Sequence, residues 1–203
     1  MIVVKKKALS LFFNFSIIIL EIIGIIVGFK KNGRLGLEYY TVQSNILALI
    51  SSMLYLIFIL TKKGIPRLLQ LFKYTSTVCV TLTFCVVVLV LAPMYNFNYG
   101  YILFYNSLIF QHFLCPILTV ITFIFFDEVG ILGNKDGIKS MSITFIYAVI
   151  FTLLNVFDKI KGPYPFLMVK DQSILSSIMW YTLIFIMTYL ITLVLRKAKK
   201  RTF

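Results

Sequence analysis

Six apolar stretches, each close to the length needed to cross a membrane as a helix, restrict the fold of this chain more than any other feature. A hydrocarbon core of about 30 Å requires about 20 apolar residues in a helix, the form that satisfies its own backbone groups in lipid. The stretches cover residues 8–29, 41–60, 74–93, 105–126, 141–157 and 174–195. The sequence therefore predicts an all-α polytopic membrane protein, a single domain over residues 1–203 formed by one bundle of six transmembrane helices.

The composition excludes a water-soluble domain, because 60% of the residues are hydrophobic, 13% are charged and the mean hydropathy is +0.96. The first stretch follows three lysines but is too long for a signal peptide and lacks a cleavage site, so we expect a retained helix. Cys79, Cys85 and Cys115 all fall inside apolar stretches. This placement favours packing over disulfides or metal binding, and we expect no metal and no cofactor.

The net charge of +13 predicts topology, because most Lys and Arg residues fall on one side of the six stretches. That side holds Lys5, Lys6, Lys7, Lys62, Lys63, Arg67, Lys73, Lys135, Lys139, Arg196, Lys197, Lys199, Lys200 and Arg201. The other holds Lys30, Lys31, Arg34, Lys159, Lys161 and Lys170. The positive-inside rule predicts a multi-pass cell-membrane protein with both termini cytoplasmic. The basic side is expected to meet anionic lipid headgroups, and no nucleic-acid motif is present.

Polar residues inside the apolar stretches indicate where a site could lie, because burying them in lipid is costly. In the second stretch Thr41, Ser44 and Asn45 share one helical face, which continues through Ala48 and Ser52.

In the first stretch Asn14, Glu21, Gly24 and Gly28 share a face, and the two glycines form a GxxxG pattern that favours close helix packing. Glu21 is therefore expected to point into the bundle.

The fourth stretch contains His112, the only histidine of the chain, in a stripe with Tyr105, Cys115 or Pro116, and Thr119. Pro116 has no N–H to donate to the His112 carbonyl, so the helix is expected to be irregular there.

Thr41 and His112 have the chemistry of a hydroxyl nucleophile and its base. Asn45 is a candidate oxyanion donor, Glu21 a candidate for orienting the imidazole, and Ser44 a further candidate for binding substrate. At 1.5 Å per residue, Glu21 and His112 lie roughly 12 Å and 10 Å from the same membrane boundary, whereas Thr41 lies at the boundary itself. Whether Thr41 reaches His112 stays open at this point.

Structural interpretations compete with these roles. Thr41 is also a good helix N-cap, and His112 could join helices by a hydrogen bond. Gln43, Ser44 and Asn45 could supply interhelical hydrogen bonds, and Glu21 could have a structural partner.

Three motifs resemble the family of androgen-induced and androgen-dependent six-helix membrane proteins and their bacterial relatives. They are YYTVQSNIL at residues 39–47, HFLCPIL at residues 112–118 and GPYPF at residues 162–166. The animal members are threonine hydrolases that cleave fatty acid esters of hydroxy fatty acids. By motif position, the resemblance implies Thr41 and His112 as the catalytic pair.

We therefore expect an intramembrane hydrolase of fatty acid esters with a Thr nucleophile and a His base. The rivals are a small-molecule binding or transport subunit, in which Asn14, Glu21, Asn45 and His112 bind the ligand, and a non-catalytic structural protein. The sequence does not determine the length of the acyl chain in the substrate, nor whether the protein forms a homo-oligomer.

Overall fold

The computed structural model describes residues 2–61 and 64–202, and within them every regular element is helical. The α-helices are α1 (Ile2–Asn32), α2 (Tyr40–Leu60), α3 (Arg67–Val86), α4 (Ala92–Met94), α5 (Tyr99–Phe104), α6 (Cys115–Phe125), α7 (Asn134–Ser140), α8 (Ser142–Val156) and α9 (Ile174–Arg201). Short 3-10 helices are η1 (Gly33–Glu38), η4 (Pro165–Leu167) and η5 (Val169–Asp171), and π-helices are η2 (Val87–Leu91) and η3 (Ile109–Leu114). The predicted all-α class is confirmed.

Five helical segments of the described chain are long and apolar enough to cross a membrane. They are Lys5–Lys31, Tyr40–Leu60, Arg67–Met94, Asn134–Val156 and Ile174–Arg201. The segment Ile109–Phe125 is apolar but shorter, and its 17 residues rise roughly 26 Å. Apolar helices thus occur at all six predicted places, and five of them reach spanning length.

The fourth helix begins later than the sequence predicted. Asn106 adopts a left-handed backbone conformation with φ of 52°, which ends any helix running through it. Tyr105 lies outside the helix, 45% exposed, and its ring stacks on Tyr101 with centroids 5.0 Å apart. Tyr105 is therefore not part of the interior stripe, whereas His112, Cys115, Pro116 and Thr119 are buried.

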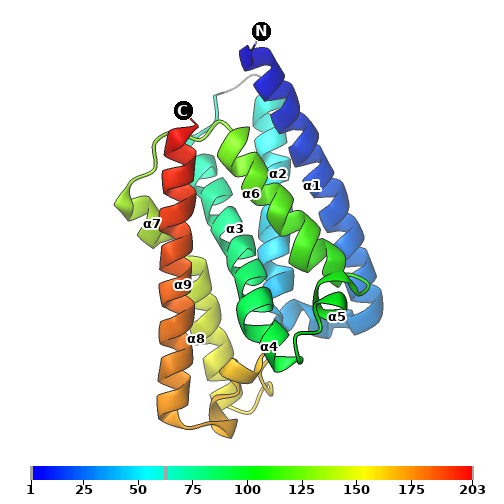
Figure 1. The fold of residues 1–203 in the computed structure, drawn as a ribbon, viewed down its shortest axis with the longest axis vertical. Coiled ribbons are helices and arrows are strands. Elements are labelled where there is room, and N and C mark those ends of the chain that lie inside the picture. Colours follow the sequence, from blue (N-terminus) through cyan, green and yellow to red (C-terminus); the bar gives the residue numbers. More distant parts are fainter. Residues whose placement is uncertain (1, 62–63, 203) are drawn as a thin grey trace.

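α3 is the central helix and the most buried of the five (Figure 1). It packs against α2 and α6 on one side, where α1 also contacts both, and against α9 on the other. The two chain ends lie at the same end of the molecule, whereas α4, α5 and the segment before α9 lie at the opposite end (Figure 1).

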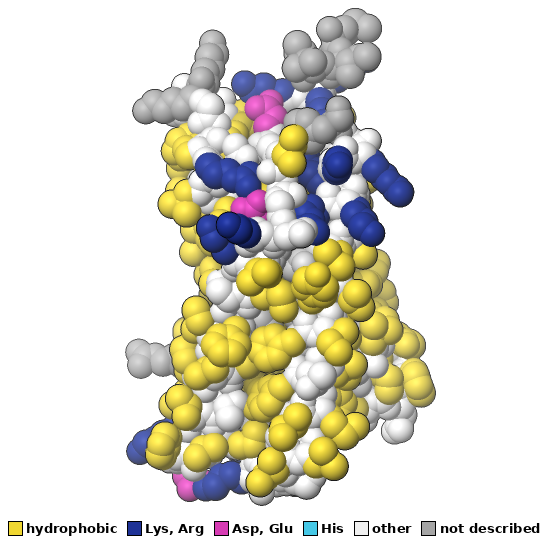
Figure 2. Space-filling view, turned by 90° about the vertical axis from the view of Figure 1, so that its left-hand side faces the viewer, with side chains coloured by type: hydrophobic (Ala, Val, Ile, Leu, Met, Phe, Trp, Pro, Cys, Tyr) yellow, Lys and Arg dark blue, Asp and Glu magenta, His cyan; other side chains and the backbone are white. Residues whose placement is uncertain are grey.

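The surface divides into zones along the long axis. Figure 2 shows hydrophobic side chains over the middle and lower part of one face, most of the visible Lys and Arg side chains toward the end that holds the termini, and a smaller group of them at the opposite end. Leu183, Ile186, Leu190 and Val194 of α9 are among the exposed apolar residues. Lys62 and Lys63 of the predicted basic side lie outside the described residues, as does the side chain of Arg34.

The GxxxG face of α1 packs inward, as predicted, with Asn14 and Glu21 fully buried. A Cβ added to Gly24 would lie 2.8 Å from the Cβ of Phe110, whereas one added to Gly28 would stay 3.5 Å from Gln111 and Ser107. Gly24 therefore sets how closely α1 approaches η3.

A buried polar network joins the helices near the end that holds the termini. The Lys73 ammonium donates hydrogen bonds to Asn14 Oδ1 at 2.6 Å and to Ser52 Oγ at 2.7 Å, and lies 3.8 Å from Asp127 Oδ2. Asp127 Oδ1 accepts from Ser10 and Asn14 at 3.0 and 2.8 Å. The network thus connects α1, α2 and α3 with the end of α6.

Two lysines that the sequence analysis assigned to the cytoplasmic surface belong to this interior instead. Lys73 lies inside α3 and is completely buried, and Lys199 of α9 is 3% exposed and donates to the backbone carbonyl of Asp127. From their positions in the sequence, Lys73 was expected in the loop before the third apolar stretch and Lys199 in the C-terminal tail. Both are buried because carboxylate, amide and carbonyl oxygens surround their ammonium groups.

Replacing Lys73 by Met should lower the free energy of unfolding by about 3–5 kcal/mol, because Asp127 would be left as an unpaired buried charge. The measurement is denaturant unfolding in detergent. The exposed Lys135→Met is the matched control and should change stability by less than about 0.5 kcal/mol. Equal stability of the two variants would contradict a structural role for the network, and adding Asp127→Asn to Lys73→Met should restore part of the loss.

Candidate functional site

A cavity of about 250 Å³ lies at the end of the molecule opposite the termini. We call it the polar cavity. Its lining includes Thr41, Ser107, Gln111, His112 and Tyr164. The cavity therefore brings together the start of α2, the π-helix η3 and the segment before α9, which are far apart in the sequence.

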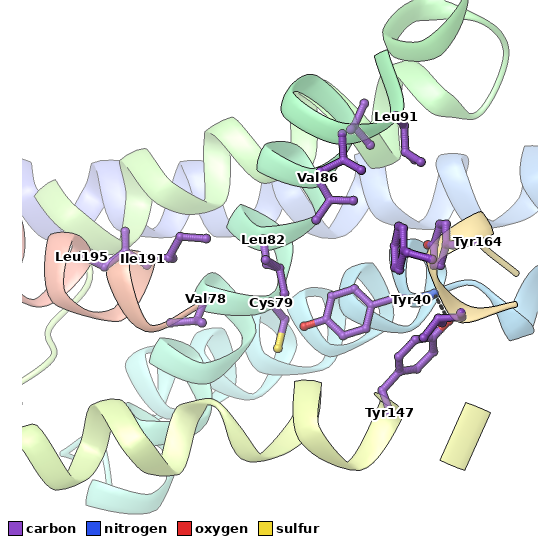
Figure 3. Close-up of a cluster of buried hydrophobic side chains, with 14 of the residues drawn as sticks. Tyr40, Val78, Cys79, Leu82, Val86, Leu91, Tyr147, Tyr164, Ile191 and Leu195 are labelled. Atoms are coloured by element: carbon purple, nitrogen blue, oxygen red, sulfur yellow. Dashed lines mark hydrogen bonds between the residues drawn. The ribbon is translucent and has the colours of Figure 1, made fainter. Parts of the chain in front are cut away.

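The start of α2 has no side-chain cap of its own. Its N-cap residue is Tyr39, which makes no capping hydrogen bond, and Thr41 lies inside the first turn. The Tyr40 N–H donates to the Tyr147 hydroxyl at 3.1 Å, and the Thr41 N–H donates to the Tyr164 hydroxyl at 3.2 Å. Figure 3 shows Tyr40, Tyr147 and Tyr164 gathered at this end of the buried cluster. Thr41 is therefore not the N-cap.

The side chain of Thr41 is buried, with 6% exposure, yet it lines the polar cavity. Its Oγ1 lies 3.2 Å from the Tyr164 hydroxyl. The same tyrosine thus contacts both the backbone and the hydroxyl of Thr41, and this fixes the position of the hydroxyl relative to the helix start.

Tyr164 reaches Thr41 because of the backbone before it. Gly162 has φ of +101°, and a Cβ there would lie 3.2 Å from the Leu167 carbonyl oxygen, so only glycine fits without strain. The Tyr164 ring stacks on Phe166 with centroids 5.0 Å apart. Burial raises the pKa of Tyr164 to about 12, so its hydroxyl stays protonated at neutral pH.

Tyr164 was not predicted from the sequence to be a site residue. It belongs to the GPYPF motif at residues 162–166. The sequence feature that could have indicated Tyr164 is its place between Pro163 and Pro165, directly after Gly162 and Pro163 in a turn-forming segment.

His112 lies in η3 and is 7% exposed. Its Nδ1 is 2.6 Å from the Ile102 carbonyl oxygen, which can only accept, so Nδ1 holds the proton. In the neutral ring Nε2 is then the acceptor. Among the described residues no hydrogen bond joins His112 to Thr41, although both line the polar cavity. A reacting group could therefore enter between them.

The π-helix accounts for the position of His112. Pro116 cannot donate to the His112 carbonyl, and the wider turn directly precedes it. Gln111 and His112 are consecutive, yet both are buried and both line the cavity.

Asn45 links the two halves of the site. Its Nδ2 donates to the Thr41 carbonyl at 2.7 Å and to the Gln111 carbonyl at 3.1 Å. Both N–H groups are engaged, so Asn45 fixes α2 against η3. Its role as an oxyanion donor stays a prediction.

Ser44 faces away from this cavity. Its hydroxyl lies 2.8 Å from Thr83 Oγ1 and 2.9 Å from the Thr41 carbonyl, so it joins α2 to α3. Ser44 therefore makes an interhelical hydrogen bond, which was the structural alternative to a role in substrate binding.

Glu21 is buried as predicted but does not meet the imidazole, because the Ile102 carbonyl occupies the Nδ1 position. Neither carboxyl oxygen of Glu21 has a hydrogen-bond partner among the described residues. The orienting role predicted for Glu21 is therefore corrected: Ile102 supplies that contact.

No family model, no curated protein and no solved structure matches this chain. The resemblance described above therefore rests on its three sequence motifs, and the site is interpreted from its own geometry.

Replacing Tyr164 by Phe should lower the free energy of unfolding by about 1–3 kcal/mol, because the buried Thr41 N–H loses its acceptor. Thermal and denaturant unfolding in detergent would measure the loss. Tyr39→Phe is the matched control, since Tyr39 is 40% exposed and contacts Tyr164 only edge to face. If both variants lose the same stability, the Tyr164 hydroxyl does not cap α2.

Proposed function

We propose that this protein is an intramembrane hydrolase of fatty acid esters, fatty acid esters of hydroxy fatty acids among them, with Thr41 as nucleophile and His112 as general base. The observation that supports this most is the shared cavity, in which a buried hydroxyl and a histidine with an accepting Nε2 are both present. The sequence motifs around the same two residues support it independently.

In the proposed reaction Thr41 Oγ1 attacks the ester carbonyl carbon while its proton passes to Nε2 of His112, directly or through one water molecule. The tetrahedral intermediate collapses to an acyl-threonine, and the alcohol leaves with the proton from His112. Water then gives its proton to His112 and attacks the acyl-threonine. This releases the carboxylic acid and restores Thr41, and no cofactor takes part.

Tyr164 assists in this proposal by holding the Thr41 hydroxyl. Its proton is retained at neutral pH, so it can donate to Thr41 Oγ1 while accepting the Thr41 N–H. The threonine proton is then free for His112. Thr41 also lies in the first turn of α2, where the helix dipole favours developing negative charge.

Thr41→Ala should abolish release of fatty acid from ester substrates, because this variant lacks the nucleophile. His112→Ala should reduce the release by at least about 100-fold, because this variant lacks the general base. Thr41→Ser should keep part of the activity. The assay measures fatty acid release by purified protein in mild detergent from linear and branched fatty esters. Thr61→Ala, at the exposed far end of α2, is the matched control.

Wild-type protein without release above a detergent blank on every ester would overturn the hydrolase proposal. A ligand that binds equally well to wild type and to Thr41→Ala would then favour a binding or transport protein. Thermal unfolding of each variant shows whether lost release reflects lost structure.

For the membrane we propose six crossings, with Ile109–Phe125 as the short fourth, and both termini in the cytoplasm. The gathering of Lys and Arg at the end that holds the termini supports this orientation (Figure 2). Both termini at one end require an even number of crossings.

Cysteine labelling tests this topology. A Lys159→Cys variant should react with a membrane-impermeant maleimide in intact cells, whereas Lys135→Cys should react only after permeabilisation, because the two exposed lysines lie at opposite ends. The native cysteines lie within helices, and the unmodified chain gives the background. The reverse pattern would place the termini outside.

A further inference from the structure

The wall of the polar cavity formed by α1 and η3 carries polar groups that the proposed reaction does not use. Lys31 lies in the last turn of α1, Gln111 lies in η3, and Ser107 lies just before η3. All three line the cavity together with Thr41 and His112. This wall is therefore open to the same ligand that reaches the two proposed catalytic residues.

The three side chains gather around Gly28 of α1. A Cβ added to Gly28 would lie 3.5 Å from Gln111 Nε2 and 3.5 Å from Ser107 Oγ, so both polar atoms lie beside this glycine. Lys31 follows Gly28 by three residues, which places it on the same face of α1, one turn closer to the end of the helix. Its ammonium lies 4.6 Å from the centroid of the Tyr105 ring, and Tyr105 precedes Ser107 by two residues. A cation, an amide and a hydroxyl therefore meet on one side of the cavity.

Two of these side chains are nearly buried and have hydrogen-bonding capacity that the protein does not use. Ser107 is 3% exposed, and its hydroxyl makes no hydrogen bond to any described residue. Gln111 is 4% exposed, and its one side-chain hydrogen bond within the described chain is long, from Nε2 to the Gly24 carbonyl at 3.5 Å. Because an amide nitrogen carries two N–H groups, one donor of Gln111 remains available. Such donors favour a ligand that accepts hydrogen bonds.

Lys31 adds a positive charge that no described acidic residue neutralises. It is the only Lys, Arg, Asp or Glu among the described residues that line the cavity, and it forms no ion pair within the described chain. Its contact with the Tyr105 ring uses no lone pair, so the N–H donors of the ammonium stay available to other partners. Three donors, one of them charged, have the chemistry that recognises a carboxylate or a phosphate.

The alcohol half of the ester is expected on this side of the proposed reaction centre. His112 gives its proton to the leaving alcohol oxygen, so that oxygen lies next to the imidazole. Gln111 directly precedes His112 in η3 and lines the same cavity. An alcohol half that extends from the imidazole along η3 therefore reaches Gln111, Ser107 and Lys31.

We propose that Lys31, Ser107 and Gln111 form an anion subsite, and that the protein selects fatty esters whose alcohol half carries a carboxylate or a phosphate. Esters of hydroxy fatty acids supply the first group, and phospholipids supply the second. This inference rests on the proposed hydrolase function. It adds the chemistry and the position of the group that distinguishes a substrate from a neutral fatty ester.

The first test compares turnover of two esters that differ in charge: the palmitic ester of a hydroxystearic acid and the same ester with the carboxyl group converted to a primary amide. For wild type, kcat/KM should be at least about tenfold higher for the acid, the contribution expected of one charge-assisted hydrogen bond. Lys31→Met should lose this preference. Lys31→Glu should prefer the amide, because two carboxylates repel each other.

Lys30→Met is the matched control. Lys30 precedes Lys31 in the last turn of α1 and is exposed, but it is not among the residues that line the cavity. Both lysines can neutralise the carbonyl end of the helix, so a role of Lys31 in helix stability alone would affect both variants alike. Lys30→Met should keep the wild-type preference for the acid, and thermal unfolding without ligand shows whether each variant keeps its fold.

The second test measures binding without turnover, using compounds that contain no carboxylic ester: a hydroxystearate, the matching amide and octadecyl phosphate. The shift in thermal unfolding is recorded for wild type, Lys30→Met and Lys31→Met. The two anions should stabilise wild type and Lys30→Met more than the amide does, and this difference should disappear in Lys31→Met. A larger shift with the carboxylate supports a subsite for hydroxy acid esters, and a larger shift with the phosphate supports a subsite for phospholipids.

The outcomes separate the two proposals. Ester turnover with equal kcat/KM for the acid and the amide, and equal thermal shifts for all three compounds, would overturn the anion subsite and leave the hydrolase standing. Thermal shifts that depend on the anion and on Lys31, without any ester turnover, would keep the subsite and overturn the hydrolase. Equal thermal shifts without turnover would overturn both.

Discussion

The start of α2 depends on hydroxyl groups from other parts of the chain, and the candidate site follows from this dependence. Each helix begins with N–H groups that have no partner within the helix, and inside an apolar protein or membrane an unpaired group costs several kcal/mol. Here Tyr147 of α8 and Tyr164 of the following segment accept from Tyr40 and Thr41. Satisfying the backbone of α2 therefore places a tyrosine hydroxyl beside the Thr41 side chain, so a requirement of folding also positions the proposed nucleophile.

Polar contacts hold the two ends of the bundle in different ways. At the end of the termini a charged pair, Lys73 and Asp127, is buried with amide and hydroxyl partners. At the opposite end the contacts around Thr41 involve tyrosine, threonine and backbone groups. Lys31 lines the polar cavity at this end, and an exposed ion pair joins Lys170 to Asp158. Charge at this end therefore lies at the surface and at the cavity wall, whereas at the end of the termini it forms a buried pair.

The sequence predicted the features that depend on composition and helical period. The apolar helices, the inward faces of Asn14 and Glu21, and the burial of Thr41 and His112 all follow from one-dimensional patterns. It did not predict contacts between segments distant in the chain. Lys73 was interpreted as a surface lysine because its partner Asp127 is 54 residues away in the sequence. The contact between Tyr164 and Thr41 depends on the turn at Gly162.

Because η3 is a π-helix, the direction in which its side chains point depends on the number of residues in the turn as well as on their types. A helical residue added or removed rotates everything beyond it by roughly 100° about the axis. The wide turn at Ile109–Leu114 absorbs such an offset and lets Gln111 and His112 face the same interior. Insertions and deletions near this turn are therefore a route by which a scaffold of this kind could acquire, lose or redirect its histidine while every side chain around it stays the same.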